Sequence, residues 1–200
     1  MQPLAKAPMM QNSFEVEADQ TFPQIDFTNL GLDDEGKPIE FPDLPYYGFD
    51  HGDKTAKLAT VILSHQGPQH SKPEHLRAVW VAGYFHDLGR TQPWTKPDPY
   101  HAARSASLLE RVLKATDLWA DGLLRDTACR LVANHSTRPE TNDPLARALW
   151  DADCFEAARF EPGQREGLVK LKERTAKDVL CTDWARNHQR LKTYMEFRGW

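Results

Sequence analysis

One short segment constrains this chain more than any other. Residues 79–90 read Val-Trp-Val-Ala-Gly-Tyr-Phe-His-Asp-Leu-Gly-Arg, an apolar run that ends in His86 and Asp87. Because Gly89 follows almost at once, the pair stands where a buried helix ends. Neighbours on a helix differ in direction by about 100°, so the imidazole and the carboxylate can close on an atom between them. Such ligands suit divalent transition metals, although a helix-end histidine that a neighbouring acid stabilises is an equally simple interpretation.

From residue 50 onward the apolar residues recur with helical period, and no useful segment has strand period. Prolines and potential caps mark the helix starts, as at Pro73, Pro99 and Pro144. We expect an all-α bundle. Its helices are expected over residues 50–67, 73–88, 100–116, 121–134 and 143–161, with one or two more amphipathic helices in residues 164–197.

Residues 1–49 have a different character. Prolines and glycines are too dense there for a long helix, yet Phe22, Phe27, Leu30 and Phe41 are among too many apolar groups for a free linker. We expect an irregular N-terminal arm over residues 1–49 that packs on a helical domain over residues 50–200. The arm has room for a short two-stranded ribbon, and its first dozen residues are expected to be disordered.

Composition excludes several classes of protein. The net charge of −4 argues against nucleic acid as a partner. No apolar run approaches the roughly 20 residues that a membrane span needs, and residues 1–10 lack the layout of a secretory signal. Three widely spaced cysteines suggest reduced, packed thiols. We therefore expect a cytoplasmic protein with one domain and a true core.

Histidines stand at corresponding points of the expected helices. His51 and His101 lie near helix starts, whereas His86 and His135 lie at helix ends. Antiparallel neighbours bring the end of one helix beside the start of the next, so these groups can meet at one end of a bundle. Asp153 lies inside a strongly apolar helix, where a carboxylate is costly unless a cation or proton compensates it. Taken singly, His101 could be a plain first-turn residue, and His135 could favour the negative end of its helix.

The order His51, His86-Asp87, Asp153 resembles the H…HD…D signature of the HD-domain superfamily of metal-dependent phosphohydrolases. Residues 85–90 resemble its apolar-HD-apolar-Gly-basic core, and residues 150–157 resemble its last ligand helix; the likeness covers about residues 50–160. It implies an HD-type helical bundle and a first metal held by His51, His86, Asp87 and Asp153. The same alignment makes Asp151 a neighbour rather than a ligand, a choice that the family pattern leaves open.

His101 and His135 match the two additional histidines of superfamily members that bind two metals. The resemblance therefore implies that Asp87 bridges to a second ion held by this pair. Two departures bear on it: His51 precedes Gly-Asp instead of apolar residues, and Asn134 stands where some two-metal members carry a histidine. The expected cofactor is one or two divalent ions of Mn, Fe, Co, Ni or Zn, with Mg as a further option.

Basic residues follow the expected ligands closely. Guanidinium groups match phosphate in a bidentate way, and we expect four side chains to face a phosphate: Lys54, Arg90, Arg104 and Arg138. Asp87, Arg90 and Arg104 are the candidates for a catalytic role. His65, His70, His75 and His188 fit no ligand pattern and are interpreted as surface or packing residues, and Cys154 as a core residue. Trp94 could be a pocket lid or loop packing.

The resemblance implies hydrolysis of a phosphomonoester, a phosphodiester or a nucleotide through a metal-activated water. Two other interpretations stay open. Some two-metal members of the superfamily are di-iron oxygenases that cleave carbon–carbon or carbon–phosphorus bonds, and the His101/His135 pair is compatible with that chemistry. A non-catalytic metal or ligand sensor is the third. Apart from a small-molecule substrate, the sequence indicates no partner, and it carries no signal for an oligomeric state.

Overall fold

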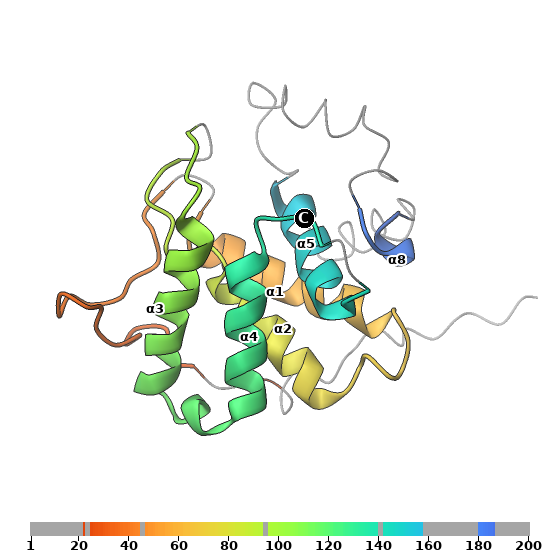
Figure 1. The fold of residues 1–200 in the computed structure, drawn as a ribbon, viewed down its shortest axis with the longest axis horizontal. Coiled ribbons are helices and arrows are strands. Elements are labelled where there is room, and N and C mark those ends of the chain that lie inside the picture. Colours follow the sequence, from red (N-terminus) through yellow and green to blue (C-terminus); the bar gives the residue numbers. More distant parts are fainter. Residues whose placement is uncertain are drawn as a thin grey trace, which may run out of the picture.

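The computed structural model describes residues 22, 25–44, 47–93, 96–139, 142–157 and 180–186. Within these ranges it has helices and isolated bridges but no strand, so the predicted all-α class is confirmed (Figure 1). The elements in chain order are α1 (Phe49–Ser64), α2 (Pro73–Phe85), α3 (His101–Ala115), the 3-10 helix η1 (Asp117–Ala120), α4 (Gly122–Asn134), α5 (Pro144–Ala157) and α8 (Asp183–Arg186).

Local chemistry sets the helix starts close to the predicted positions. Pro73 occupies the first turn of α2, and the side chain of Asp121 accepts a hydrogen bond from the amide of Leu124 and so caps α4. Two ends come earlier than expected. α1 stops at Ser64, before Gly67 with its φ of 117°, and α2 stops at Phe85, after which residues 86–89 form a turn. The expected stop of α5 and most of the expected C-terminal helices lie outside the described residues.

The helices pack around one core. α1 packs on α2 and α5, and α4 packs on α2 and α3. Figure 1 shows α3 and α4 side by side, with α1 and α2 crossing behind them. The apolar stripe of each helix points into this space, where side chains are at most 2 % exposed: Leu58, Ile62, Val79, Leu109, Leu131 and Leu149. The ends of α2 and α4 and the starts of α1 and α3 are thereby brought together.

Two glycines let α1 and α2 approach closely beside their histidines. A Cβ atom on Gly52 would lie 2.4 Å from the carbonyl oxygen of Tyr84, and one on Gly83 would lie 2.5 Å from the Cα of Ala56. Both neighbours are backbone atoms, which cannot give way without moving a helix. The unexpected glycine after His51 therefore has a packing role: it permits the close helix crossing next to His51.

The described part of the arm packs on the helices. Leu30 and Ile39 are buried, and the ring of Phe27 lies 4.8 Å from that of Tyr84, centroid to centroid. In the described part of the arm, the ribbon considered from the sequence amounts to two isolated antiparallel bridges, Leu32 with Pro38 and Leu44 with Tyr47, and a turn closes the first. The first dozen residues lie outside the described part of the chain. Where it is described, the arm thus covers the helices with apolar side chains and forms no helix or strand before Phe49.

No described helix has the length and apolar character to cross a membrane. All three cysteines are free thiols: Cys181 is buried, and Cys129 and Cys154 are half-buried. Burial raises the pKa of the Cys154 thiol well above its usual range, so this thiol stays protonated at neutral pH. That state agrees with the interpretation of Cys154 as a packing residue.

Candidate metal centre

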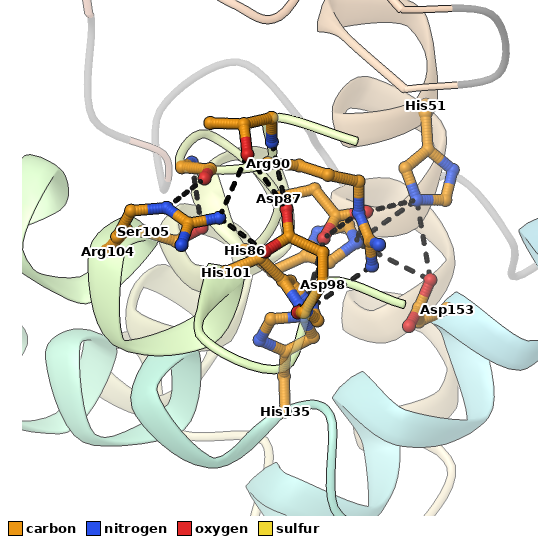
Figure 2. A network of polar contacts seen from close by, with 12 residues as sticks. His51, His86, Asp87, Arg90, Asp98, His101, Arg104, Ser105, His135 and Asp153 are labelled. Carbon is orange, nitrogen blue, oxygen red and sulfur yellow. Dashed lines mark hydrogen bonds and ion pairs between the residues drawn. The ribbon is translucent and has the colours of Figure 1, made fainter. Parts of the chain in front are cut away.

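Side chains from five segments converge at one end of the bundle (Figure 2). The first turn of α1, the turn after α2, the start of α3, the C-terminus of α4 and the third turn of α5 each contribute at least one. Five of these side chains are buried, and that of Asp153 is 28 % exposed. Together they are the six predicted ligand residues: His51, His86, Asp87, His101, His135 and Asp153.

One group of ligand atoms surrounds His86. Its Nε2 lies 3.1 Å from Nε2 of His51 and 3.4 Å from Oδ1 of Asp153. Oδ2 of Asp87 lies 3.5 Å from the same nitrogen and 3.7 Å from Nε2 of His51. Two atoms that each bind one ion at about 2.1 Å, at angles near 90–110°, are roughly 3.0–3.5 Å apart. Three of these four distances lie within that range and the fourth, 3.7 Å, slightly exceeds it, so the group is placed to bind one divalent ion.

A second group shares Asp87 with the first. Nε2 of His101 lies 3.1 Å from Nε2 of His135, and Oδ1 of Asp87 lies 3.4 Å and 3.5 Å from these two nitrogens. The two oxygens of one carboxylate thus face different sets of histidines. This is the arrangement that a bridging carboxylate between two ions requires.

Hydrogen bonds fix the orientation of three imidazole rings. In His86, His101 and His135, Nδ1 lies 2.8, 2.5 and 2.7 Å from the carbonyl oxygen three residues earlier. A carbonyl only accepts, so each Nδ1 carries a proton, and a ring that holds no second proton presents an Nε2 lone pair to the cluster. Lone pairs of two neutral rings that face each other at 3.1 Å repel unless a cation or proton lies between them. The donor set therefore fits a metal.

The electrostatics of the centre also favour a cation. Burial disfavours a charged His86, but the carboxylates of Asp87 and Asp153 raise its pKa to about 9. Although burial opposes ionisation of both carboxyl groups, the histidines hold the pKa values of Asp87 and Asp153 below the usual range. For His101, burial lowers the pKa. Without a metal ion, two carboxylates thus retain a proton on His86, which a divalent ion can replace.

Two buried polar atoms of the ligand residues lack a hydrogen-bond partner in the described part of the chain. Oδ1 of Asp87 and Nδ1 of His51 make no hydrogen bond with the described residues. A buried carboxylate oxygen without a donor is costly, and Oδ1 of Asp87 is the oxygen that faces His101 and His135. Metal coordination is the natural use of such an atom.

The neighbouring acids of α5 point to different places. Asp153 faces the cluster, with Oδ1 3.3 Å from Nε2 of His51. Asp151 faces the segment before α8: it accepts hydrogen bonds from the backbone amides of Cys181 and Thr182 at 2.7 and 2.8 Å and from the Thr182 hydroxyl at 2.7 Å. Burial raises the pKa of Asp151. This geometry supports Asp153 as the ligand and gives Asp151 a structural use.

The predicted phosphate contacts are placed unevenly around the centre. Arg90 lies inside it, with Nε 3.0 Å from Oδ1 of Asp87. Arg104 lies on the side away from Asp153 (Figure 2) and donates to the carbonyl of Gly89 at 2.9 Å. The Arg104 guanidinium also forms an ion pair with Asp98 in the loop before α3. Arg104 therefore orders the turn over residues 86–89, which carries His86 and Asp87. A substrate contact by Arg104 stays a prediction.

The other two basic residues lie at the rim. Lys54 pairs with Asp50 at 2.5 Å on the first turns of α1, and its phosphate contact is likewise untested. Arg138 is exposed and lines a cavity of about 310 Å³ between the C-terminus of α4, the loop after it and α5. His135, Leu149 and Trp150 line the same cavity. The second ligand group thus touches a hollow large enough for a small molecule.

Two residues of this region were not predicted from the sequence. Asp98 is a loop residue whose carboxylate accepts from the Thr91 amide at 2.9 Å and pairs with Arg104 at 2.5 Å. Tyr47, in the arm, places its ring 4.2 Å from the guanidinium carbon of Arg90. Asp98 could have been noticed in the sequence, because an aspartate directly before the predicted helix start at Pro99 is a typical capping position. No local sequence pattern marks Tyr47.

The remaining histidines stay outside the cluster where they are described. The ring of His65 lies 5.1 Å from that of Trp184, and His70 and His75 are half-buried. These positions agree with packing or surface roles. His188 and Trp94 lie outside the described residues.

Comparison with known families identifies the arrangement. The model of the HD domain family matches residues 48–158, more than half of the chain and a range that includes all six ligand candidates. The chain belongs to the HD-domain family. Neither the curated proteins nor the solved structures yield a match. The HD domain runs from just before α1 to the end of α5, so most of the arm and α8 lie outside it.

Proposed function

We propose that this HD domain is a metal-dependent phosphohydrolase that acts on a small phosphate ester or nucleotide. The observation that carries the proposal is the pair of ligand groups joined by Asp87. Oxygen and imidazole nitrogen are their only donors, and no thiolate is among them, which is typical of catalytic rather than structural sites.

The ligand residues would bind the metal ions in two groups. The first ion would be bound by the group around His86, and the second by His101, His135 and Oδ1 of Asp87. Bound there, a divalent ion supplies Lewis acidity that activates water and offsets the charge of a phosphoryl group. The hydrogen bonds that Nδ1 of three histidines donates to carbonyl oxygens keep the Nε2 atoms aimed inward, so these rings need not turn when an ion enters.

The cavity beside His135 supports a small substrate. Its volume of about 310 Å³ is at the lower end of ligand pockets, which span roughly 300–1,000 Å³. Arg138 at its wall is exposed and has no ion-pair partner among the described residues, so its charge is available to a phosphate. Trp150 and Leu149 provide apolar surface for the rest of the molecule. We infer that the phosphate lies toward His135 and Arg138.

A di-iron oxygenase is the second candidate. The observation that favours it is the His101–His135 pair facing Oδ1 of Asp87, because an oxygenase needs both ions. The two functions differ in metal and in co-substrate. Iron content and oxygen uptake therefore distinguish them directly.

The experiment combines metal analysis with an activity screen. Purified protein is analysed for bound metals, then assayed for phosphate release from nucleotides and small phosphate esters with Mn, Co, Ni, Fe or Mg, and for oxygen uptake with Fe. We expect metal-dependent phosphate release that Asp153→Asn reduces by more than the roughly 10–100-fold cost of losing an outer-sphere partner. Asp126→Asn, on the exposed face of α4, is the matched control and should keep full activity.

Three results would overturn the proposal. Oxygen uptake without phosphate release would favour the oxygenase. Bound metal without turnover in either assay would favour a sensor. Phosphate release that survives Asp153→Asn unchanged would place the active site elsewhere.

A further inference from the structure

The guanidinium of Arg90 lies where the second ligand group would hold its ion. Its Nε is 3.0 Å from Oδ1 of Asp87, and its Nη2 is 3.0 Å from Nε2 of His101. These are two of the three atoms that make up that group. Figure 2 shows the side chain of Arg90 reaching over Asp87 into the cluster instead of outward. A protein cation thus contacts the same atoms that a second metal ion would bind.

The contact with Asp87 is an ion pair without good hydrogen-bond geometry. Neither Nε of Arg90 nor Oδ1 of Asp87 makes a hydrogen bond with the described residues, although both atoms are buried. The attraction is therefore mainly electrostatic, and the oxygen keeps its capacity for a ligand bond. An ion that coordinates this oxygen would replace a poorly aligned partner.

Other contacts hold Arg90 in this position. The ring of Tyr47 lies 4.2 Å from its guanidinium carbon, and the backbone amide of Arg90 donates to the carbonyl of Asp87 at 2.9 Å. The side chain of Arg90 is only 13 % exposed. A side chain that the arm covers in this way is expected to favour the inward position over a solvated one.

The two ligand groups respond differently to this cation. Arg90 approaches Asp87 through Oδ1, whereas Oδ2 faces His51 and His86. An ion in the first group meets a carboxylate oxygen that Arg90 does not contact. An ion in the second group would lie beside a positive charge in a buried site, where like charges repel strongly. The guanidinium has to move out before that ion can bind.

We propose that Arg90 sets the number of metal ions in this HD domain by competing with the second ion. With Arg90 inward, the domain holds one ion, on the group around His86. With Arg90 outward, His101, His135 and Oδ1 of Asp87 take a second ion, and the guanidinium becomes available to a phosphate. Tyr47 of the arm stabilises the inward position. This inference rests on the metal site of the proposed function.

The test is a metal titration with readouts that do not depend on turnover. Full-length protein is dialysed against a series of free Mn²⁺ concentrations, and bound Mn is counted per protein. Electron paramagnetic resonance then separates isolated Mn²⁺ from exchange-coupled pairs. The variants are Arg90→Gln, Tyr47→Ala and the control Arg125→Gln, which removes an arginine charge from the surface of α4. Circular dichroism confirms folding.

In the wild type, binding of the second Mn²⁺ equivalent should need a free Mn²⁺ concentration at least about tenfold higher than binding of the first. Arg90→Gln should move that second step at least about tenfold lower and give coupled spectra, while the first step changes little. Tyr47→Ala should shift the second step in the same direction by a smaller factor. Arg125→Gln should match the wild type.

The idea fails if the second step is the same in the wild type, Arg90→Gln and Tyr47→Ala, or if the wild type binds both equivalents together with a coupled spectrum. Should Arg90→Gln not fold, Tyr47→Ala alone decides by the position of its second step. Failure of the metal site itself looks different, since then the wild type would not bind even the first equivalent. One tight equivalent without any effect of the variants would overturn only the role of Arg90.

Discussion

Asp151 and Asp153 are separated by one residue on α5, and their carboxylates bind opposite parts of the molecule. Asp153 lies 3.3–3.4 Å from two histidine nitrogens of the metal centre. Asp151 accepts three hydrogen bonds from Cys181 and Thr182, which precede α8. These two α5 positions, on different faces of the helix, thus connect the candidate metal centre with the C-terminal segment.

This division predicts opposite effects of two similar substitutions. Asp153→Asn should abolish tight metal binding and leave the fold intact, because the change removes a ligand at the rim of the core. Asp151→Asn should keep metal binding but lower the free energy of unfolding by about 1–3 kcal/mol, because an amide cannot accept all three hydrogen bonds. Equilibrium dialysis and urea denaturation of both variants test this pair. Equal loss of metal in both would contradict the assignment of Asp153.

The close crossing of α1 and α2 predicts a sensitive glycine. Gly83→Ala would place a methyl group 2.5 Å from the backbone of Ala56, so the helices must separate and the free energy of unfolding should fall by about 1–3 kcal/mol. The matched control is Gly122→Ala at the start of α4, where the nearest atom is 3.6 Å away on a flexible side chain. That change should be neutral or stabilising. Thermal denaturation compares the two, and equal stability would show that the crossing is loose.

The raised pKa of His86 predicts proton release on metal binding. In the metal-free protein, the carboxylates hold this pKa near 9, above the unfolded value of about 6.5. Below about pH 9 the ring carries a proton that must leave before Nε2 can bind an ion, so apparent affinity should rise up to tenfold per pH unit and level off above that value. Calorimetry in two buffers of different ionisation enthalpy measures the released proton. A binding enthalpy independent of the buffer at pH 7 would contradict this state of His86.

The contacts of Asp98 with Thr91 and Arg104 predict a contribution to the free energy of unfolding that depends on pH. Burial opposes its ionisation, but hydrogen bonds from the Thr91 amide and the Arg104 guanidinium lower the pKa of Asp98 to about 2. Because this value is below the unfolded one of about 3.9, the stabilisation is complete above about pH 4 and is lost as pH falls toward 2. Asp98→Asn should therefore cost about 2 kcal/mol at pH 6 and progressively less below pH 4. A constant difference from pH 6 to pH 3 would show that the charge of Asp98 is not the cause.

Most of the fold could be predicted from local signals. Helix starts follow from caps and prolines such as Pro73 and Asp121, whose effects reach only a few residues. The end of α2 was placed three residues late, because Leu88 continues the apolar pattern although the chain has already turned. Helical period alone does not distinguish a helix from the turn that follows it.

The positions of the ligand residues were predictable in part. The histidines at helix ends and the acid within α5 were visible as a pattern, and neighbouring antiparallel helices bring such positions together. Pairings across the bundle were not visible. The contact of Tyr47 with Arg90 and the anchoring of residues 181–182 by Asp151 depend on tertiary packing, for which a single sequence carries no short-range signal. The orientation of the Arg90 side chain, inward instead of toward solvent, also depends on tertiary packing and could not be predicted from the sequence.

The central claim is that His51, His86, Asp87 and Asp153 hold a divalent ion. The most direct measurement is an anomalous difference map from crystals grown with Mn²⁺. We predict a strong peak about 2.0–2.3 Å from Nε2 of both histidines and from the carboxylate oxygens of both aspartates. A map whose peaks all lie on the protein surface, with none among these four side chains, would contradict the account.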